Sequence, residues 1–254
     1  GLSPQEFPSL VGRRACRDLA EGSYVWRKDV ERPVSEADLA GLPERWGLIA
    51  RFGDLERMAS WGPRAVEIHL TGEDLERPIP PGKFEQELIV HVPEMVGEFY
   101  LNLAAANDAV RQRSLEVART AIRKARELGE NFRGVPRVVL HPGGHSRDEA
   151  AEPERLRDLF VRSMEELEKE GVKLLPENLP PYPWVKGGRW VSSIFTGSRE
   201  IRELCESRGW HLTLDLSHAA LACAVDGVDL AGFLRELRPW VEHYHISDAY
   251  GVDG

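Results

Sequence analysis

The chain has 254 residues, of which 42% are apolar, and this suits one large globular domain with a small appendage. Its formal net charge of −9 weighs against a nucleic-acid partner, because an acidic protein repels phosphate backbones. No apolar run approaches the ~20 residues of a membrane-spanning helix, and no two of the three cysteines form a CxxC pair. These features predict a cytoplasmic protein without a membrane anchor.

Residues 1–34 differ from the rest of the chain. They contain short β-like runs and turn glycines at Gly12 and Gly22, but no long amphipathic helix. We expect a small β-rich appendage here. Ser35 is a plausible N-cap for a short helix that leads into the main domain, residues 35–254. The first residue is Gly1 instead of methionine, which indicates a processed or longer natural protein.

From about residue 46 the sequence alternates short apolar runs with longer amphipathic stretches, a pattern typical of repeated βα units around a parallel sheet. The amphipathic stretches 107–129, 153–171 and 198–209 predict helices, and each ends in a glycine that suits a helix C-terminus. Seven runs predict strands, at 46–52, 65–70, 87–93, 137–141, 172–177, 211–215 and 241–246.

This rhythm predicts an α/β fold, a (β/α)8 TIM barrel of which seven strands are visible. The eighth βα unit would have to follow Gly254. An open, doubly wound sheet is the alternative. We favour the barrel because polar residues end nearly every predicted strand, whereas a doubly wound sheet gathers its ligands at a single switch point.

Six of the eight histidines lie on or just after a predicted strand, and carboxylates lie at equivalent places. In a parallel barrel these positions converge on one mouth. Imidazole and carboxylate are ligands that zinc, manganese, iron and cobalt accept, so the sequence predicts a divalent-metal site, with zinc or manganese favoured and magnesium or cobalt as alternatives. The candidate ligands are His91, His141, Glu177, Asp215, His218 and His245.

Three of these positions allow a second interpretation. Glu177 follows two leucines that belong in the barrel wall, so its carboxylate needs either the mouth or a buried partner, because burial alone is costly. Asp215 could instead cap the next helix, with His218 exposed. Strand alternation puts His243 and His245 on one face; His245 is the better ligand, and His243 is expected in the barrel core.

Other polar residues are candidates for substrate binding. Arg51, Glu67 and His69 could contact hydroxyl or phosphate groups, or could form ion pairs inside the barrel. The long loop after Glu177 carries Trp184, Lys186 and Arg189, which would suit a lid over a polar or anionic substrate; a packed surface loop is the alternative. The chain has no phosphate-binding loop, no nucleophile elbow and no dinucleotide fingerprint.

From about residue 46 onward the chain resembles the xylose-isomerase-like barrels, which include sugar isomerases, epimerases and type IV AP endonucleases. The motifs PENL, LDLSHA and YHISDA carry this resemblance, and the segments YLNLAAANDAV and VVLHPGGHS are similar to the endonuclease branch, AP endonuclease family 2. The order and spacing of the five motifs match the family.

The resemblance implies roles for residues of this chain. Glu177, Asp215 and His245 would bind metal, His218 would bind metal or substrate, and His91 and His141 match two zinc ligands of the endonucleases. The endonucleases use a further Asp-x-His pair, which Asp253 would begin, and a glutamate on the eighth strand that this sequence lacks.

Residues 1–34 resemble the later part of the antifreeze-like (SAF) domain of sialic acid synthases, through the opening GLSP and the VGR turn. This resemblance implies a longer fusion in which a nonulosonic-acid synthase precedes the barrel. It also implies a homodimer, because in those synthases the segment lies against a neighbouring subunit.

These observations lead to three hypotheses. The first is a divalent-metal-dependent isomerase or epimerase of a small sugar or sugar phosphate, serving nonulosonic acid synthesis, with Glu177 and His218 as catalytic residues. The second is a metal-dependent phosphodiesterase that acts on abasic DNA. The third is a barrel without catalytic activity that binds carbohydrate within a larger synthase.

Overall fold

The computed structural model describes most of the predicted barrel. The chain divides into two compact units, Gly1–Trp46 and Gly47–Gly254. The described residues are 46–147, 152–185 and 187–247, together with the single residues 20, 26 and 29. The expected appendage with its boundary at residue 34, the short helix at Ser35, and the candidate residues Lys186 and Asp253 lie outside them and stay predictions.

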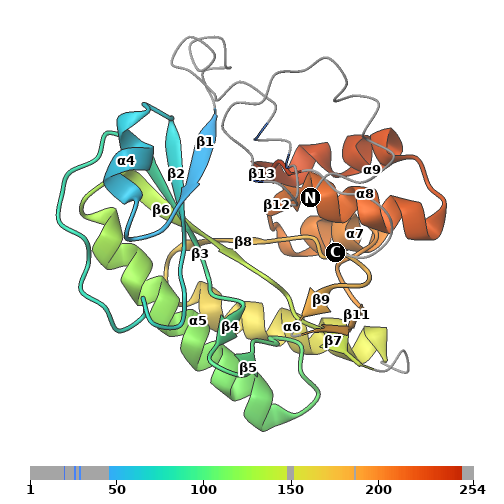
Figure 1. Ribbon diagram of the computed structural model, residues 1–254. Helices are drawn as coiled ribbons and strands as arrows, with labels where there is room; N and C mark the ends of the chain where they lie inside the picture. The colour runs from blue at the N-terminus through green and yellow to red at the C-terminus, as the bar shows by residue number, and fades with distance from the viewer. Residues whose placement is uncertain are drawn as a thin grey trace, which may run out of the picture. The chain divides into compact units, whose positions relative to one another are not determined.

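Each of the seven predicted runs coincides with one strand of a parallel barrel wall, although the fourth strand begins at Arg133, four residues before its predicted run (Figure 1). The first five form one sheet in the order β1-β2-β3-β6-β8, β12 pairs with β13, and a parallel bridge from Glu177 to Thr213 links the two groups. The strands are β1 (Gly47–Ala50), β2 (Ala65–His69), β3 (Glu87–His91), β6 (Arg133–Leu140), β8 (Lys173–Pro176), β12 (Leu212–Asp215) and β13 (Val241–His245).

The wall curves back on itself. Strand order follows chain order throughout, and side chains of β13, the last strand, contact Glu67 of β2. A flat, doubly wound sheet would separate these two strands and would reverse its strand order at a switch point. The predicted barrel fold is therefore confirmed, and the doubly wound alternative is wrong.

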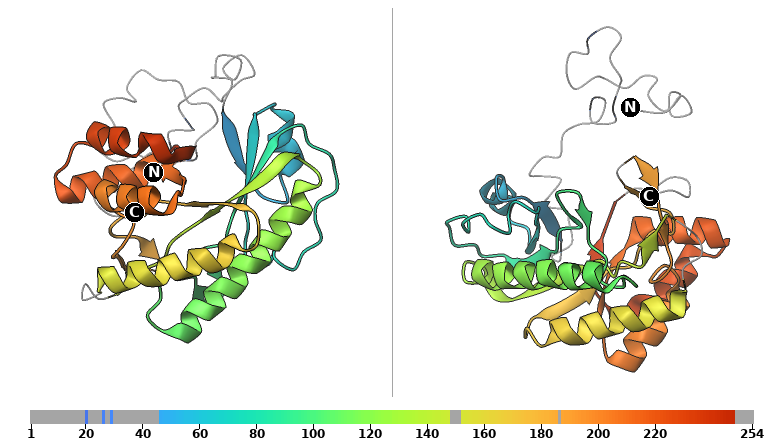
Figure 2. Two further views of the ribbon diagram at one scale, coloured as in Figure 1. Left: turned by 180° about the vertical axis from the view of Figure 1, so that it is seen from behind. Right: turned by 90° about the horizontal axis from the view of Figure 1, so that it is seen from below.

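Helices pack on the outside of this wall, and Figure 2 shows α5 and α6 running side by side below it. Three short antiparallel pairs, β4 with β5, β7 with β11 and β9 with β10, lie in the loops that follow β3, β6 and β8. The helices are α4 (Leu55–Ser60), α5 (Asp108–Gly129), α6 (Pro153–Glu168), α7 (Ser198–Arg208), α8 (Leu216–Asp226), α9 (Leu230–Leu237) and η2 (Arg238–Trp240). The short strands are β4 (Met95–Val96), β5 (Phe99–Tyr100), β7 (His145–Ser146), β9 (Trp184–Val185), β10 (Gly188–Arg189) and β11 (Val191–Ser192).

The glycines that end the predicted helices serve two different purposes. Gly209 caps α7 in the left-handed conformation, with φ of 67°, as predicted, whereas Lys169 takes the cap position of α6 and Gly171, with φ of 70°, follows it two residues later. Gly129 is different: it is the last residue of α5, and Glu130 takes the cap position with φ of −62°. A Cβ at Gly129 would lie 3.1 Å from Pro136, so this glycine permits close packing of α5 on β6. The expectation of a glycine cap on α5 was wrong.

None of the described helices is long and apolar enough to cross a membrane. Among the described residues, Cys205 and Cys223 are buried and free.

Candidate metal centre

Strand alternation places the predicted site directly above an apolar layer inside the barrel. Ile89, Val139 and Leu175 form a small buried cluster on the inner face of the wall. Successive inward side chains of a strand are two residues apart, so the next inward residues toward the carboxyl ends are His91, His141 and Glu177. Apolar and polar layers thus follow one another along the barrel axis, and the polar one lies at the mouth.

Glu177 is the centre of the site. It is 1% exposed, and its two oxygens face four imidazoles. His91 Nε2 lies 3.1 Å and His141 Nε2 3.4 Å from Oε2. His245 Nδ1 lies 3.0 Å and His218 Nδ1 3.5 Å from Oε1. The buried carboxylate therefore has the partners that its burial required.

Asp215 ends β12 and has a different role for each of its oxygens. Oδ1 accepts the backbone N–H of His218 at 2.8 Å and the hydroxyl of Ser217 at 2.6 Å, so it caps α8. Oδ2 lies 3.8 Å from Nδ1 of His245. The helix-cap and ligand interpretations are thus compatible in geometry. His218 is half-buried instead of exposed, contrary to the second interpretation of that histidine.

Backbone carbonyls determine which nitrogen carries the proton in two of the imidazoles. Nδ1 of His91 lies 2.8 Å from the carbonyl oxygen of Val92, and Nδ1 of His218 lies 2.8 Å from that of Asn178. A carbonyl oxygen only accepts, so in both residues Nδ1 donates. Nε2 is therefore the nitrogen of each ring that can bind a ligand. In His91 this nitrogen faces Glu177.

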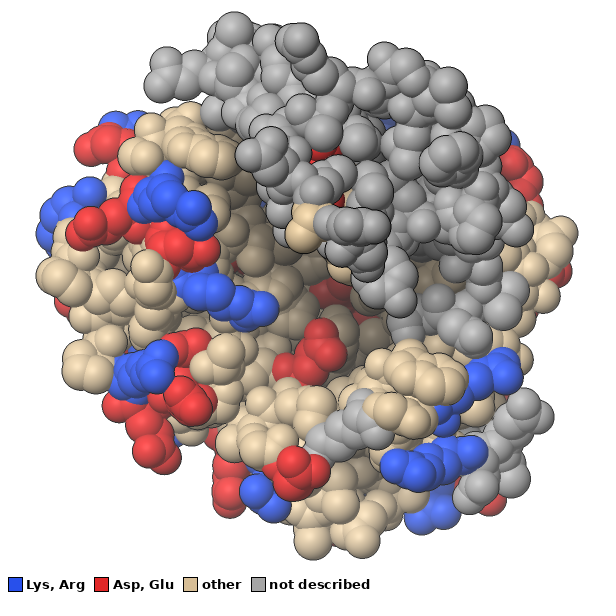
Figure 3. Space-filling view, in the orientation of Figure 1, with Lys and Arg blue, Asp and Glu red and all other residues tan. Residues whose placement is uncertain are grey.

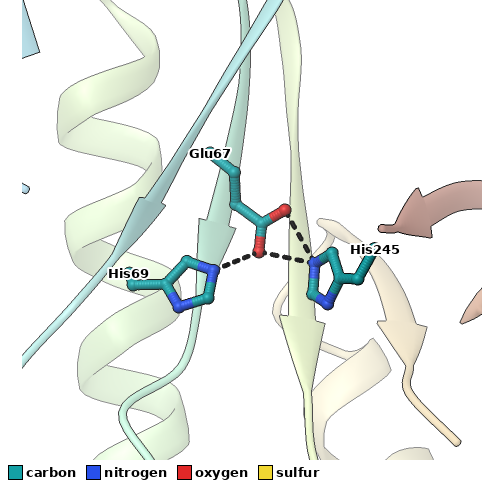
Figure 4. A group of neighbouring side chains, drawn as sticks. All are labelled: Glu67, His69 and His245. Carbon is teal, nitrogen blue, oxygen red and sulfur yellow. Dashed lines mark hydrogen bonds and ion pairs between the residues drawn. The ribbon is translucent and has the colours of Figure 1, made fainter. Parts of the chain in front are cut away.

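A second buried carboxylate, Glu67 of β2, lies beside the first. Its Oε2 accepts from Nε2 of His243 at 2.6 Å, and both of its oxygens lie 2.9 Å from Nε2 of His245. Nε2 of His69 lies 2.9 Å from Oε1. Figure 4 shows Glu67 between His69 and His245. Of the two interpretations of Glu67 and His69, contacts inside the barrel are the ones observed.

The carboxylates remain ionised because two of their imidazole neighbours, His141 and His245, hold their protons. Burial would raise the pKa of Glu177, but the charge of His141 and contacts from three imidazoles outweigh it and hold this pKa well below its usual range. Burial would lower the pKa of His245 and His141, but neighbouring carboxylates raise these values to about 10 and about 9. Protons therefore supply the positive charge that these carboxylates need.

A small cavity adjoins these residues. Its volume is about 150 Å³, several times the ~30 Å³ that one water occupies in the liquid, so it suits a small molecule. Among its lining residues are Glu94, Tyr100, His141, His145 and His218. Figure 3 shows a hollow on one face of the molecule, with Asp and Glu side chains inside it and Lys and Arg on parts of its rim. The acidic interior favours a cation over a polyanion.

The remaining predicted substrate residues lie in different surroundings. Trp184, on β9, lines the cavity and is 59% exposed. The guanidinium of Arg189, on β10, lies 3.7 Å above the ring of Tyr182. Arg51 is exposed and donates to the carbonyl oxygen of His69, so it meets the polar layer only through the backbone.

Sequence reasoning missed three residues near the site. Glu94 lines the cavity, with Oε1 3.9 Å from Nδ1 of His141, and the charge of His141 lowers its pKa although burial opposes this. His145 stacks on Tyr100 at 3.8 Å between ring centroids, and burial, helped by the charge of His141, lowers its pKa to about 4. His243, expected in the core, contacts Glu67. Sequence position could have indicated two of them, because Glu94 follows the predicted ligand His91 by three residues and His145 follows the predicted ligand His141 by four.

The donor set fits a divalent ion. In each of three groups the ligand atoms all lie within 4.8 Å of one another, each group combines carboxylate with imidazole, and two of the groups share Glu177. They are Glu67, His69 and His245; His91, His141 and Glu177; and Glu177, Asp215 and His218. The predicted ligands thus converge as expected, apart from Asp253, which lies outside the described residues.

The sequence from residue 55 to residue 254 matches the model of the xylose isomerase-like TIM barrel family, AP endonuclease family 2. The chain belongs to this family. The resemblance of the five motifs is thereby confirmed, whereas the match does not reach residues 1–34, so the antifreeze-like resemblance stays a prediction. No curated protein sequence is similar enough to be matched.

The fold is similar to solved structures of sugar epimerases. A D-tagatose 3-epimerase-like protein has 23% identity and a TM-score of 0.56, covering 79% of this chain and 76% of its own. A 3-keto-D-glucoside 4-epimerase from E. coli has 13% identity and a TM-score of 0.55, with 80% of each chain covered. An L-ribulose 3-epimerase has 16% identity and a TM-score of 0.54, with 80% and 70% covered. These likenesses establish the fold, and together with the family they agree with the prediction of an enzyme.

Proposed function

We propose that this chain is a divalent-metal-dependent isomerase or epimerase of a small sugar or sugar phosphate. The observation that carries the proposal is the arrangement at Glu177: a buried carboxylate with four imidazoles around it, beside Asp215 and a cavity of about 150 Å³. The names of the similar structures point to the same substrate class.

The ion would be held by Glu177, Asp215 and His245, with His91 and His141 at the other oxygen of Glu177. Zinc and manganese suit this mixture of nitrogen and oxygen donors, and magnesium or cobalt are the alternatives. When bound, such an ion would polarise a carbonyl and a neighbouring hydroxyl of the substrate and so would acidify the hydrogen on the hydroxyl-bearing carbon next to the carbonyl.

Isomerisation and epimerisation then need groups that take and return a proton at carbon. Glu177 is not among the residues that line the cavity, whereas Glu94 and His218 are. The charge of His141 helps keep Glu94 ionised, and the carbonyl of Asn178 holds Nδ1 of His218 so that Nε2 is free to accept. We therefore assign proton transfer to Glu94 and His218, and ion binding to Glu177.

The cavity fits the small size of the proposed substrate. Trp184 and Tyr100 offer aromatic faces along its lining, against which the apolar face of a sugar ring can lie. Lys186 and Arg189, on the same loop, are the proposed partners of a phosphate group. The link with nonulosonic acid synthesis rests on the resemblance of residues 1–34 alone.

Hydrogen exchange at carbon tests the proposal without knowledge of the product. The purified protein, loaded with Mn²⁺ or Zn²⁺, is incubated in D₂O with a panel of ketoses, aldoses and their phosphates, and NMR reports deuterium at the carbon beside the carbonyl. We expect incorporation for at least one sugar, and a loss of at least 100-fold in Glu94→Gln and His218→Asn. Glu85→Gln, an exposed carboxylate outside the cavity, is the matched control and should exchange like the parent.

The phosphodiesterase remains the second candidate, because His91 and His141 both approach Glu177, as the endonuclease pattern requires. The same preparations are therefore incubated with an abasic duplex. Cleavage of that duplex without deuterium incorporation into any sugar would overturn the proposal in favour of this candidate. Absence of both reactions in metal-loaded protein would favour the carbohydrate-binding barrel.

A further inference from the structure

Glu67 and Glu177 share one imidazole. Nδ1 of His245 lies 3.0 Å from Glu177, and Nε2 of the same ring lies 2.9 Å from both oxygens of Glu67 (Figure 4). Glu67 is on β2 and His245 is at the end of β13, so this contact crosses the barrel interior. The orientation of a proposed ion ligand thus depends on a carboxylate from the opposite side.

Imidazole nitrogens lie at contact distance from both carboxylates. Ligands about 2.1 Å from one ion lie roughly 3 Å apart in octahedral and roughly 3.4 Å apart in tetrahedral coordination. The imidazole nitrogens around Glu177 are 3.0 to 3.5 Å from its oxygens, which matches these spacings, and the contacts of His91 and His245 are also hydrogen bonds when the rings carry protons. At Glu67, the nitrogens of His243 and His245 lie 2.6 and 2.9 Å from the carboxylate oxygens and form hydrogen bonds, of which the shorter is below the spacing of two ligands of one ion.

We infer that Glu67 is a positioning residue for the metal site: it accepts the Nε2 proton of His245 and so leaves Nδ1 as the nitrogen that faces Glu177 and Asp215. This inference rests on the proposed function, because it assumes an ion at Glu177. A carboxylate that receives the far N–H of a ligating histidine fixes its tautomer and ring orientation and makes it a stronger donor.

The surroundings of Glu67 suit this role. Its side chain is 4% exposed, and its described partners are imidazoles, with no lysine or arginine among them. His243, two residues before His245 on β13, donates to the Glu67 carboxylate. His69, two residues after Glu67 on β2, lies 2.9 Å from the same carboxylate. The ring of His69 stacks on that of His91, with 4.5 Å between the ring centroids, so one neighbour of Glu67 also contacts a neighbour of Glu177.

Metal affinity and stoichiometry test this inference together. Co²⁺ or Mn²⁺ is titrated calorimetrically into metal-free parent, Glu67→Gln and the matched control His243→Asn, which removes a different imidazole from the same carboxylate. We expect Glu67→Gln to bind the same number of ions with an affinity lower by about 10–100-fold. The His243→Asn variant should stay within about threefold of the parent.

A second readout is independent of affinity. In Zn²⁺-loaded protein with ¹⁵N-labelled histidine, NMR should show His245 protonated at Nε2 in the parent, and a weakened or lost Nε2 proton signal in Glu67→Gln. Glu67→Gln with parental affinity and an unchanged His245 spectrum would overturn the inference. So would the loss of one bound ion, since Glu67 would then be a ligand itself. A parent that binds no divalent ion would instead overturn the proposed function.

Discussion

Carboxylates lie at both ends of the barrel strands, but their ion-pair partners differ between the two ends. At the amino-terminal end of the strands Glu87 pairs with Arg64 at 2.9 Å and with Arg137 at 2.8 Å, and Glu85 pairs with Arg133. At the carboxyl end, Glu67 and Glu177 have only imidazoles as charged partners within the part of the chain that the structure describes.

This difference separates structural charge from functional charge. An arginine is permanently protonated, so its pair with a carboxylate is complete and leaves no place for another cation. An imidazole releases its proton near neutral pH and then offers a lone pair to a metal. The side chain of Glu87 is 36% exposed, whereas that of Glu177 is 2% exposed. The carboxyl end therefore has the groups that we propose as ion ligands, and the amino end has solvent-screened ion pairs.

The largest expected effect is that of Glu177→Gln compared with Glu87→Gln. The first should lower the affinity for Zn²⁺ or Mn²⁺ by more than about 100-fold, because even the loss of an outer partner costs about 10–100-fold. The second should leave affinity unchanged. Elemental analysis and calorimetry measure both, with circular dichroism to confirm folding. Equal metal content in the two variants would contradict the contrast between the ends.

The next effect concerns pH in metal-free protein. Carboxylate neighbours raise the pKa of His141 to about 9 and of His245 to about 10 against the opposing effect of burial. Between pH 6.5 and these values the folded state binds protons that the unfolded state has lost. The contribution of these two imidazoles to the free energy of unfolding is thus fully present below about pH 6.5. Above that pH the free energy of unfolding falls, by up to about 1.4 kcal/mol per pH unit for each proton.

Urea unfolding from pH 6 to pH 10 in the presence of a chelator measures this dependence. His141→Asn should give a shallower decline, and Glu87→Gln should run parallel to the parent. A stability that stays constant or rises over this range would show that the imidazoles at the carboxyl end do not carry the charge we assign to them.

The smallest effect is expected at the amino end. Glu87→Gln removes two pairs with partly exposed arginines, and such pairs contribute about 1 kcal/mol or less. The free energy of unfolding should fall by that amount at low salt and by less at 0.5 M NaCl, because salt screens exposed charges. A loss that is larger than this and insensitive to salt would mean that the amino end is not a screened surface network.

Local sequence was enough to determine the elements and the ligand candidates. Period-two alternation and the glycine-ended helices predicted all seven strands and the helices α5, α6 and α7, because these patterns reflect which face each element buries. The same periodicity placed His91, His141 and Glu177 one layer above buried apolar residues. The prediction for Gly129 was wrong, because close packing against Pro136 requires a glycine just as a helix cap does, and the sequence does not distinguish the two causes.

Only the tertiary structure decided how these residues combine. Glu67 and His245 are 178 positions apart, and nothing in either strand indicates that curvature of the wall brings them to 2.9 Å. The partition of Asp215 between a helix cap and His245, and the proton on Nδ1 of His218, likewise depend on contacts with other segments. Alternation determines which side chains point inward; barrel closure determines which of them meet, and that meeting sets their charge.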